Sequence, residues 1–560
     1  MTERLLDPQP TTFYDPLYEV VVFSTLASER GPRATFWTSP KEGGEEPDDD
    51  TEVGIEVWSK QFLPILHTYE FNRLNYLKQA GLAWLVFPSA THSRFSHALG
   101  CWLLSEWAGE TVLVSEPIPG KKKNQQRSLA RLGEKLREVE MLEEFQLALL
   151  LHDIGHFPFS HVIENNDVLL AKYAAKNGDV VLDHESIGRE LIQGGGKVCA
   201  MFREYTRKKL GEVEDERFLS EALKKFSGVN AGNILYILDP RSCALPREMS
   251  HKKSLLLAVH ELVSGVIDLD RLDHYHRDSH FMGVHLGQFN VRGLLHHMML
   301  TSEDVEEGGA MKIQLFGDGI DHAFQMLYAK TSLTQAVFNN ECNLAYEVML
   351  NHAINLHWQE AEKDITLEDF QLFLPFYDDS ELLHTLLQSP CLEAANIVQR
   401  IYLRRPFYCV GKFVIPSDVY AKLGNSKENR RASFADVLYQ QFQVLNLNRI
   451  CQQIFVRLDK HFGRFESETD WMDVREILSD SKTPQGCCVP LAQLEDHGKF
   501  VEFLRQRDQV AARTFWMFAS EADPSLITRS RGALEAAIQV VAPGHTREPI
   551  ASVLTDKLIE

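Results

Sequence analysis

The stretch that decides the fold is Leu151–His161 (LHDIGHFPFSH), which follows directly on the apolar run Met141–Leu151 (MLEEFQLALLL). The run has the length and apolar character of a buried helix. It ends in the adjacent pair His152 and Asp153. Taking a carboxylate and an imidazole out of water costs roughly several kcal/mol unless a cation or hydrogen bonds compensate. A metal ion supplies that compensation, so the pair indicates a metal site.

Three further segments carry ligand-type side chains: Thr91–Gly100 (THSRFSHALG), Asp183–Glu185 (DHE) and Asp268–Asp278 (DLDRLDHYHRD). The first is expected to open a helix, and the last falls within a helix expected over Leu255–Arg277. Two His and two Asp residues from three separate helices leave metal positions open for water and for substrate oxygens. A metal ion bound in this way lowers the pKa of water and polarises a phosphoryl group. The four segments together predict a metal-dependent phosphohydrolase.

Helical spacing indicates which side chains accompany the ligands. Asp270, His274 and Arg277 fall at i, i+4 and i+7, on one helical face. A general-acid candidate and a guanidinium for phosphate would then lie beside a carboxylate ligand. His156 shares a face with His152 if their helix continues for one more turn. A buried His-Asp pair alone is more often a structural core pair, and only the four segments together favour the metal site.

Composition limits the class of protein. The 560 residues are 44% hydrophobic and 24% charged, as in a globular protein with a sizeable core. The net charge of −21 disfavours general nucleic-acid binding, which depends on Lys and Arg, but permits a nucleotide in a metal pocket. The nine cysteines include no CxxC pair, which argues against a disulfide framework or a zinc ribbon. The chain shows neither a signal peptide nor a membrane-spanning stretch, so a cytoplasmic protein without membrane contact is expected.

The chain is expected to divide into a core over residues 1–415 and a C-terminal accessory region over 416–560, in which no motif stands out. An acidic loop over 39–54 and a basic loop over 117–127 interrupt the core. Few segments alternate as strands do, and the best candidates are Phe407–Ile415 and Gln314–Phe316.

The motifs resemble those of the HD-domain superfamily, and within it the deoxynucleoside triphosphate triphosphohydrolases. The segment Phe71–Gly100 (FNRLNYLKQAGLAWLVFPSATHSRFSHALG) is similar to the segment of that family that carries its first metal-binding histidine. The other three segments follow in the same order, and a weaker similarity at Arg400–Val410 extends the resemblance to about residue 415. The resemblance implies a mainly α fold: an HD-domain helical bundle with small β additions and a mixed, mostly helical C-terminal region.

The resemblance also implies roles for individual residues. The metal ligands fall on His97, His152, Asp153 and Asp270. The catalytic histidines fall on His156, His161 and His184. The substrate-binding positions fall on Gln79, Arg94, Arg271, His274 and Arg277. The implied cofactor is a divalent metal ion, one of Mg, Mn, Fe, Zn or Co. The implied reaction is hydrolysis of a deoxynucleoside triphosphate to deoxynucleoside and triphosphate, by a homo-oligomer (a tetramer or hexamer) that could deplete nucleotides in defence against phage.

Several positions depart from the pattern of the family. His67 and Asn75 stand where the family has the Asp and Arg that hold an activating nucleotide, so a nucleotide effector is left open. His274 and Phe338 stand where it has tyrosines. Glu341 stands where a Lys would meet phosphates, and a carboxylate repels a triphosphate. Two alternatives therefore stay open: an HD-domain nuclease, phosphodiesterase or nucleotidase with another substrate, and a nucleotide-binding sensor without catalysis.

Overall fold

The structure is a computed structural model, and part of the chain is described in it. The main part runs over residues 59–117, 127–178, 180, 182–226, 228–241, 253–265, 267–301, 312–364 and 367–414. Shorter described segments are 12–15, 17, 20–23, 34–36, 54–55, 419, 422, 437, 454–458, 475–477, 488–490, 514–520 and 524–541. Apart from their end residues, the loops expected over 39–54 and 117–127 lie outside the described residues.

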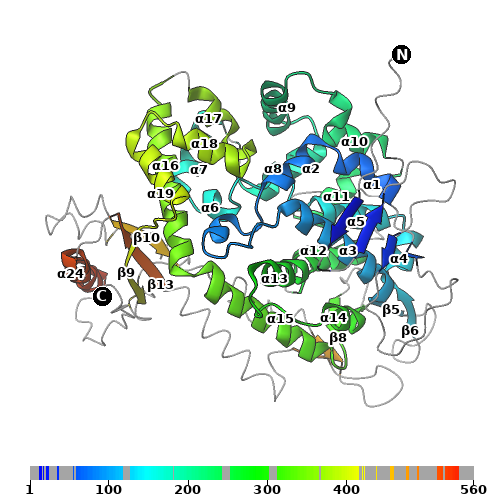
Figure 1. Cartoon of the computed structure of the whole chain (residues 1–560). Coiled ribbons are helices and arrows are strands. Elements are labelled where there is room, and N and C mark those ends of the chain that lie inside the picture. The colour runs from blue at the N-terminus through cyan, green and yellow to red at the C-terminus, as the bar shows by residue number, and fades with distance from the viewer. Residues whose placement is uncertain are drawn as a thin grey trace, which may run out of the picture.

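The described chain is mainly helical, which confirms the expected fold class (Figure 1). The first helices are α1 (Ser59–Leu66), α2 (Tyr69–Arg73), α3 (Arg94–Thr111), α4 (Leu132–Glu138), α5 (Leu142–Leu151), α6 (His161–Glu164), α7 (Asp167–Asn177), α8 (His184–Gln193), α9 (Lys197–Leu210), α10 (Leu219–Lys225) and α11 (Ala231–Leu238). The later helices are α12 (Lys253–Ser264), α13 (Leu269–Met282), α14 (Val291–His296), α15 (Gly319–Leu333), α16 (Glu341–Ala361), α17 (Glu368–Phe373), α18 (Asp379–Leu387), α19 (Leu392–Tyr402) and α24 (Pro524–Val541). Within the described residues, none of these helices is both long enough and apolar enough to cross a bilayer.

Three small sheets accompany the helices. The first has the order β1 (Thr12–Asp15), β2 (Val20–Phe23), β3 (Ala34–Phe36), β4 (Gly54–Ile55). The second has the order β12 (Cys488–Pro490), β11 (Arg475–Ile477), β8 (Lys312–Leu315), β7 (Met298–Thr301), β5 (Leu113–Pro117), β6 (Arg127–Arg131). The third has the order β10 (Ile454–Leu458), β13 (Thr514–Ala519), β9 (Tyr408–Val414). Strands β8 and β9 confirm the two strand candidates of the sequence.

Two of the sheets combine strands from both sides of the expected boundary near residue 415. Strand β11 pairs in parallel with β8, so that Arg475 lies opposite Gln314. Strand β13 pairs antiparallel with β9, so that Trp516 lies opposite Lys412. The division into a core and an accessory region stays a prediction, and these pairings are contacts between its two parts.

Helix α5 lies where the apolar run predicts it, and every residue in it except Glu143 is buried. It ends at Leu151, and the chain then turns. His152 and His156 therefore do not share a helical face, because the extra turn on which that expectation depended does not form.

The single helix expected over Leu255–Arg277 is two helices, so this prediction was wrong. Helix α12 ends at Ser264, and Asp268 begins α13 by accepting a hydrogen bond from the backbone N–H of Arg271 at 2.8 Å. A side chain that satisfies a free N–H in this way starts a new helix. The guanidinium of Arg271 also binds the carbonyl oxygen of Gly265, which stabilises the connection. The break places Asp270 in the first turn of α13.

Two clusters of buried apolar side chains form the core. One is built mainly from α3, α5, α11, α12, α13 and α15 and includes Leu104 and Leu149. The other is built mainly from α7, α8, α9 and α16–α19 and includes Phe202 and Met349. In Figure 1 the helices α16–α19 stand on one side of the molecule and α3, α5, α11 and α12 on the other, with α6 and α8 between them. The motif that follows α5 leads the chain from the first cluster to the second.

Candidate metal centre

The four residues expected to bind the metal ion converge on one point. His97 lies on α3, His152 and Asp153 follow α5, and Asp270 lies on α13. The Nε2 atom of His97 is 3.0 Å from Oδ1 of Asp270 and 3.7 Å from Oδ2 of Asp153. The Nε2 atom of His152 is 3.6 Å from Oδ1 of Asp270 and 3.5 Å from Oδ1 of Asp153. Donors around one tetrahedral ion at about 2.0–2.2 Å are roughly 3.3–3.6 Å apart, so the spacing suits a shared cation.

Hydrogen bonds at the other ring nitrogens fix both imidazoles. Nδ1 of His152 is 2.7 Å from the carbonyl oxygen of Leu149, and Nδ1 of His97 is 2.7 Å from Oδ2 of Asp273. Each ring therefore keeps its Nε2 atom for the centre, as metal-binding histidines do. The Nε2 atom of His152 is buried and is hydrogen-bonded to none of the described residues. A buried donor set with one nitrogen left unsatisfied fits a divalent metal ion.

Both carboxylates of the centre are ionised. Burial opposes the ionisation of Asp153, but the neighbouring Arg94 and the two histidines outweigh it and hold the pKa of Asp153 well below its ordinary value. Burial also opposes the ionisation of Asp270, but the neighbouring rings of His152 and His97 outweigh it and hold the pKa of Asp270 well below its ordinary value. Two carboxylates and two imidazoles are the ligands that Fe, Mn, Zn and Co bind well, while Mg prefers oxygen alone.

Behind the centre lies a buried ion pair that sequence reasoning missed. Asp273 accepts hydrogen bonds from Nε and Nη2 of Arg277 at 2.8 and 2.9 Å, and both side chains are completely buried. A side chain on Gly100 of α3 would overlap this pair, so the glycine makes room for it. Arg277, which the resemblance places among the phosphate-binding residues, neutralises Asp273 in the structure and does not line the cavity described below.

Three histidines expected to act in catalysis form a second cluster around a carboxylate. Oε2 of Glu164 is 2.7 Å from Nδ1 of His161, and Oε1 of Glu164 is 2.6 Å from Nδ1 of His184. The ring of His156 stacks on that of His184, with centroids 4.2 Å apart. Burial and the charge of Arg94 hold the pKa of His156 well below its ordinary value, so this ring is neutral. Burial opposes the charged form of His184, but Glu164 outweighs it and raises the pKa of that ring.

Glu164 is a member of this cluster that the sequence analysis did not identify. It follows His161 at i+3, on the short helix α6. Its pKa is held well below the ordinary value because hydrogen bonds from His161 and His184 outweigh the effect of burial. The HxxE spacing next to the motif was the signal that could have found it.

The chain reaches His161 through an uncommon backbone conformation. Phe159 and Ser160 both have positive φ values, 55° and 58°. Such residues cost about 1–3 kcal/mol each and persist where surrounding contacts hold them. Here the backbone N–H of Phe159 donates to Oδ1 of Asp379 at 2.6 Å, and the hydroxyl of Ser160 donates to the carbonyl oxygen of Lys78 at 3.0 Å. The strained turn at Phe159 and Ser160 places His161 in the cluster.

A glycine brings His184 to the cavity. Gly155 lies within the motif, and a Cβ atom there would overlap the backbone of His184 and of Gly188 on α8. Gly188 in turn has the backbone of Gly155 within 4 Å of where its own Cβ would lie. The two glycines allow α8 to approach the motif closely enough for the rings of His184 and His156 to stack.

A cavity of about 380 Å³ joins the two clusters. Its size is that of a small-molecule site. Ten of the twelve expected site residues line it: Gln79, Arg94, His152, Asp153, His156, His161, His184, Asp270, Arg271 and His274. His97 lies buried behind this wall, and so does Arg277. The wall also contains Glu185, Arg189, Asp239 and Glu347, which the sequence analysis did not single out as site residues.

The expected substrate-binding residues have partners within the wall. Arg94 forms an ion pair with Asp153 and donates from Nε to Ser160 at 3.1 Å. The ring of His274 packs on that of Phe338 with centroids 5.8 Å apart, at the π-helical turn Thr334–Phe338. The Oε1 atom of Gln79 is buried and accepts no hydrogen bond from any described residue.

Comparison with known proteins agrees with this geometry. Residues 94–278 match the model of the HD domain. This part of the chain is similar to HD domains. The match begins at Arg94 on α3 and ends at Asp278 on α13, so it contains the four expected metal ligands and the three histidines.

The proteins similar to this chain include a viral protein and animal enzymes. An HD domain-containing protein of Acanthamoeba polyphaga mimivirus is 26% identical over 445 residues, which is 78% of this chain and 82% of the relative. The deoxynucleoside triphosphate triphosphohydrolase SAMHD1 of Gallus gallus is 25% identical over 68% of this chain and 60% of the relative. The human enzyme is 24% identical over 62% of this chain and 52% of the relative. The chain thus resembles HD-domain phosphohydrolases, and spans only about half to three fifths of these two enzymes.

Proposed function

We propose that the protein is a metal-dependent deoxynucleoside triphosphate triphosphohydrolase that releases a deoxynucleoside and triphosphate. The observation that carries the proposal is the placement of the His-Asp ligand set and the histidine cluster around Glu164 on one cavity. Relatives that are named for this activity support the choice of substrate. The proposal includes the expected antiphage role, homo-oligomeric assembly and nucleotide effector.

The two clusters have different proposed roles in hydrolysis. A divalent ion held by His97, His152, Asp153 and Asp270 would lower the pKa of a water molecule and polarise a phosphoryl oxygen. Attack on the α-phosphorus breaks the bond to the 5′ oxygen, which must then receive a proton. His184 is the proposed donor, because Glu164 raises its pKa. The proton that the attacking water loses replaces the proton that His184 gives to the 5′ oxygen.

The other residues would bind and orient the substrate. Glu164 holds Nδ1 of both His161 and His184, which leaves the second nitrogen of each ring for a phosphate oxygen. His156 stays neutral and can donate one hydrogen bond without competing for the proton. The unsatisfied Oε1 of Gln79 would accept a hydrogen bond from a sugar hydroxyl.

A second candidate follows from the charges of the wall. The cavity arginines all have carboxylate partners, since Arg94 pairs with Asp153, Arg189 lies 3.0 Å from Asp239, and Arg271 pairs with Asp268. Few positive charges then face a substrate with several phosphates. This favours a phosphodiester or nucleoside monophosphate, so an HD-domain phosphodiesterase, nuclease or nucleotidase is the alternative.

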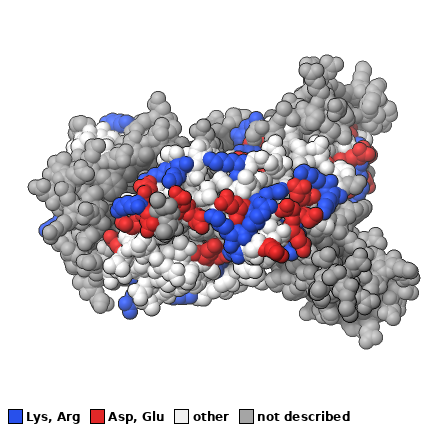
Figure 2. Space-filling model, turned by 90° about the horizontal axis from the view of Figure 1, so that it is seen from above, with Lys and Arg blue, Asp and Glu red and all other residues white. Residues whose placement is uncertain are grey.

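The surface gives no support for a polyanion partner on one face. On the described part of the surface seen from above, positive and negative side chains alternate (Figure 2). The cations of α9 are engaged by acids: Lys208 lies 2.7 Å from Asp369, and Lys209 lies 2.9 Å from Asp378. A single-sign stripe, which nucleic-acid binding needs, is not formed by these side chains.

A screen of substrates and products tests the proposal. Purified protein is incubated with each deoxynucleoside triphosphate, ribonucleoside triphosphate, monophosphate and cyclic dinucleotide and with single-stranded DNA or RNA, in Mg, Mn or Co, and products are separated by chromatography. Nucleoside plus triphosphate supports the proposal. Shortened oligonucleotides or free phosphate would replace it with the second candidate, and tight nucleotide binding without turnover would replace it with the sensor. The double variant His152→Ala/Asp153→Ala is the control for contaminating hydrolases.

A further inference from the structure

The cavity extends past the metal centre into a part of its wall that the proposed reaction does not use. Five residues form this part, which we call the far end: Arg189 and Ile192 on α8, Leu238 and Asp239 where α11 ends, and Val263 near the end of α12. In Figure 1 the helices α11 and α12 lie on the opposite side of α8 from α16. The far end therefore leads away from the wall that α16 contributes.

Helix α8 connects the histidine cluster to the far end. His184, Gly188 and Ile192 follow one another at intervals of four residues, and all three line the cavity. At a rise of 1.5 Å per residue, His184 and Ile192 are roughly 12 Å apart along the helix axis. The cavity thus has room for an organic group beyond a phosphate that is bound at the histidine cluster.

Apolar side chains form the floor of the far end. Ile192 and Val263 are almost completely buried, and Leu238 is half-buried. A phosphate group that leaves water for such surroundings loses hydrogen bonds that no apolar side chain replaces. A flat organic ring instead gains free energy when its apolar surface is buried. The floor therefore favours a ring over a phosphate.

An ion pair and a further carboxylate line the same part of the cavity. Nη1 of Arg189 lies 3.0 Å from Oδ2 of Asp239, and Nη2 of Arg189 donates to the hydroxyl of Ser186 at 2.7 Å. The charges of the pair cancel, and Glu185 adds a negative charge to this wall. Such a balance does not suit a chain of phosphates. A guanidinium beside a carboxylate offers donors and an acceptor together, which match the mixed donors and acceptors on the edge of a nucleobase.

We propose that the far end binds a nucleobase, so that the cavity takes a phosphate group with a nucleoside on each side, as in a dinucleotide. One nucleoside lies at the end formed by Gln79 and Phe338, and the phosphate lies at the metal centre. The second base lies between the apolar floor and the pair of Arg189 and Asp239. The inference goes beyond the proposed function, whose substrate has one nucleoside. It rests on the proposed binding of phosphate at the metal centre, but not on hydrolysis of a triphosphate.

Binding measurements without turnover test the inference. The full chain is freed of divalent ions, so that no probe is cleaved, and is titrated calorimetrically with deoxydinucleoside monophosphates of the four bases. The comparison probes are the methyl esters of the 5′-deoxynucleotides, which carry the same single charge but no second nucleoside. The second base should make at least one dinucleoside monophosphate bind roughly tenfold or more tighter than its methyl ester. Equal affinities for every pair of probes overturn the proposal.

Variants of the ion pair test where the second base binds. Arg189→Gln and Asp239→Asn are close in size to the wild type, and the Asn oxygen can still accept from the backbone N–H of Arg241. Each should weaken dinucleotide binding roughly tenfold and leave binding of the methyl ester unchanged. Arg203→Gln is the matched control, because Arg203 lies 3.0 Å from Glu221 at similar exposure but outside the cavity wall.

Two outcomes with folded variants contradict the proposal. Equal losses for the dinucleotide and the methyl ester would show that the ion pair does not contact a second base. Tighter binding of inorganic triphosphate to Asp239→Asn, with unchanged binding of the dinucleotide, would assign the far end to phosphates. Melting temperatures show whether each variant is folded. Because no probe is hydrolysed, the result is independent of the screen for triphosphohydrolase activity.

Discussion

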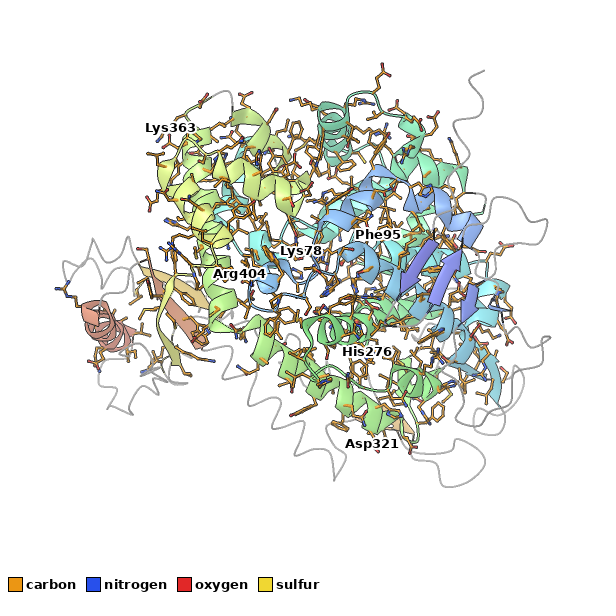
Figure 3. The ribbon with its side chains drawn as sticks, in the orientation of Figure 1. Lys78, Phe95, His276, Asp321, Lys363 and Arg404 are labelled. Atoms are coloured by element: carbon orange, nitrogen blue, oxygen red, sulfur yellow. The ribbon has the colours of Figure 1, made fainter. Side chains whose placement is uncertain are left out.

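The Nδ1 atom of His97 lies 2.7 Å from Oδ2 of Asp273, and both side chains are completely buried. This bond fixes the ring of a proposed ligand, so Asp273→Asn should weaken metal binding by roughly 10–100-fold. Calorimetric titration with Mn or Zn measures the loss. Asp321→Asn is the matched control, since Asp321 is exposed on the outside of α15 (Figure 3). Unchanged affinity in a folded Asp273→Asn variant would show that the bond does not orient the ring.

Replacing Gly155 by Ala should disturb the fold and the site together. The new Cβ atom overlaps the backbone of His184 and Gly188 and pushes α8 away. Overpacking of this kind lowers the free energy of unfolding by about 1–3 kcal/mol. The expected results are a lower melting temperature and strongly reduced activity. Gly532→Ala on α24 is the control: no atom lies within 4 Å of its Cβ position, and the change should stabilise the helix by about 0.5–1 kcal/mol. A Gly155→Ala protein of full activity would contradict the role of the close approach.

Glu164→Gln should reduce turnover without removing the metal. The amide keeps the size of the side chain but loses the charge that raises the pKa of His184 and can satisfy only one of the two Nδ1 donors. A fall in kcat of roughly 100-fold or more is expected, because positioned acid–base groups contribute on this scale. Metal content by elemental analysis should match the wild type. Loss of metal together with activity would instead make Glu164 a residue of the metal centre.

Stability should fall as the pH rises past the range in which Glu70 stays protonated. Burial raises the pKa of Glu70 from 4.5 to about 7, against the effect of the hydrogen bond from the backbone of Leu219. Since the folded-state pKa is the higher one, the stabilisation is full below about pH 4.5 and lost as the pH rises through about 7. The free energy of unfolding should fall by an amount on the order of 3 kcal/mol across this window.

Denaturant unfolding across this pH window measures the effect of Glu70. Glu70→Gln should make the decline smaller than in the wild type, because an amide does not titrate, while the buried carboxyls of Glu106 and Asp268, whose pKa values are also raised to about 7, still contribute to it. Glu216→Gln, on an exposed glutamate, should leave the decline unchanged. An equal decline in Glu70→Gln and in the wild type would show that Glu70 is not protonated in the folded protein.

Removing the metal should lower the melting temperature as well as the activity. The centre brings two carboxylates, Asp153 and Asp270, close together. An ion that binds only the folded state stabilises it by about 2.7 kcal/mol at 100 times its dissociation constant. Chelation followed by re-addition of Mn or Zn should lower and then restore the unfolding temperature. His152→Ala should show no response to either step. A wild-type protein equally stable after complete chelation would count against an ion in this site.

The sequence indicates the four proposed metal ligands more readily than the distant contacts that hold them in place. The adjacent His152 and Asp153 and the apolar helix before them are consecutive in the chain, so their geometry is local. The bond from the backbone of Phe159 to Asp379 joins residues 220 positions apart, and no periodicity reveals such a partner. Arg277 illustrates the limit most clearly. Its spacing placed it on one face with Asp270 and His274, which line the cavity, but spacing does not tell how far along the helix the cavity extends.

The helix break at Asp268 shows a different limit. Apolar periodicity continues across it, so the sequence favours one helix, and the carboxylate of Asp268, which caps α13, lies in a segment that the sequence analysis interpreted as carrying ligand-type side chains. Strands β8 and β9 were found because alternation is a local property. Their partners β11 and β13 were not, since pairing depends on chain returning from more than 100 positions away.

The side chain of Arg73 connects segments that lie far apart in the chain by hydrogen bonds. Its Nη2 atom donates to the carbonyl oxygens of His156 and Pro375, both at 2.7 Å, and its Nε atom donates to that of Phe376 at 2.8 Å. The second core cluster likewise joins Phe157 to residues as distant as Phe407. Cut to the matched residues 94–278, the chain would lose Arg73, two of these three acceptors and the members of that cluster from α16–α19. The contacts that hold the His-Asp motif in place therefore extend beyond the matched residues on both sides.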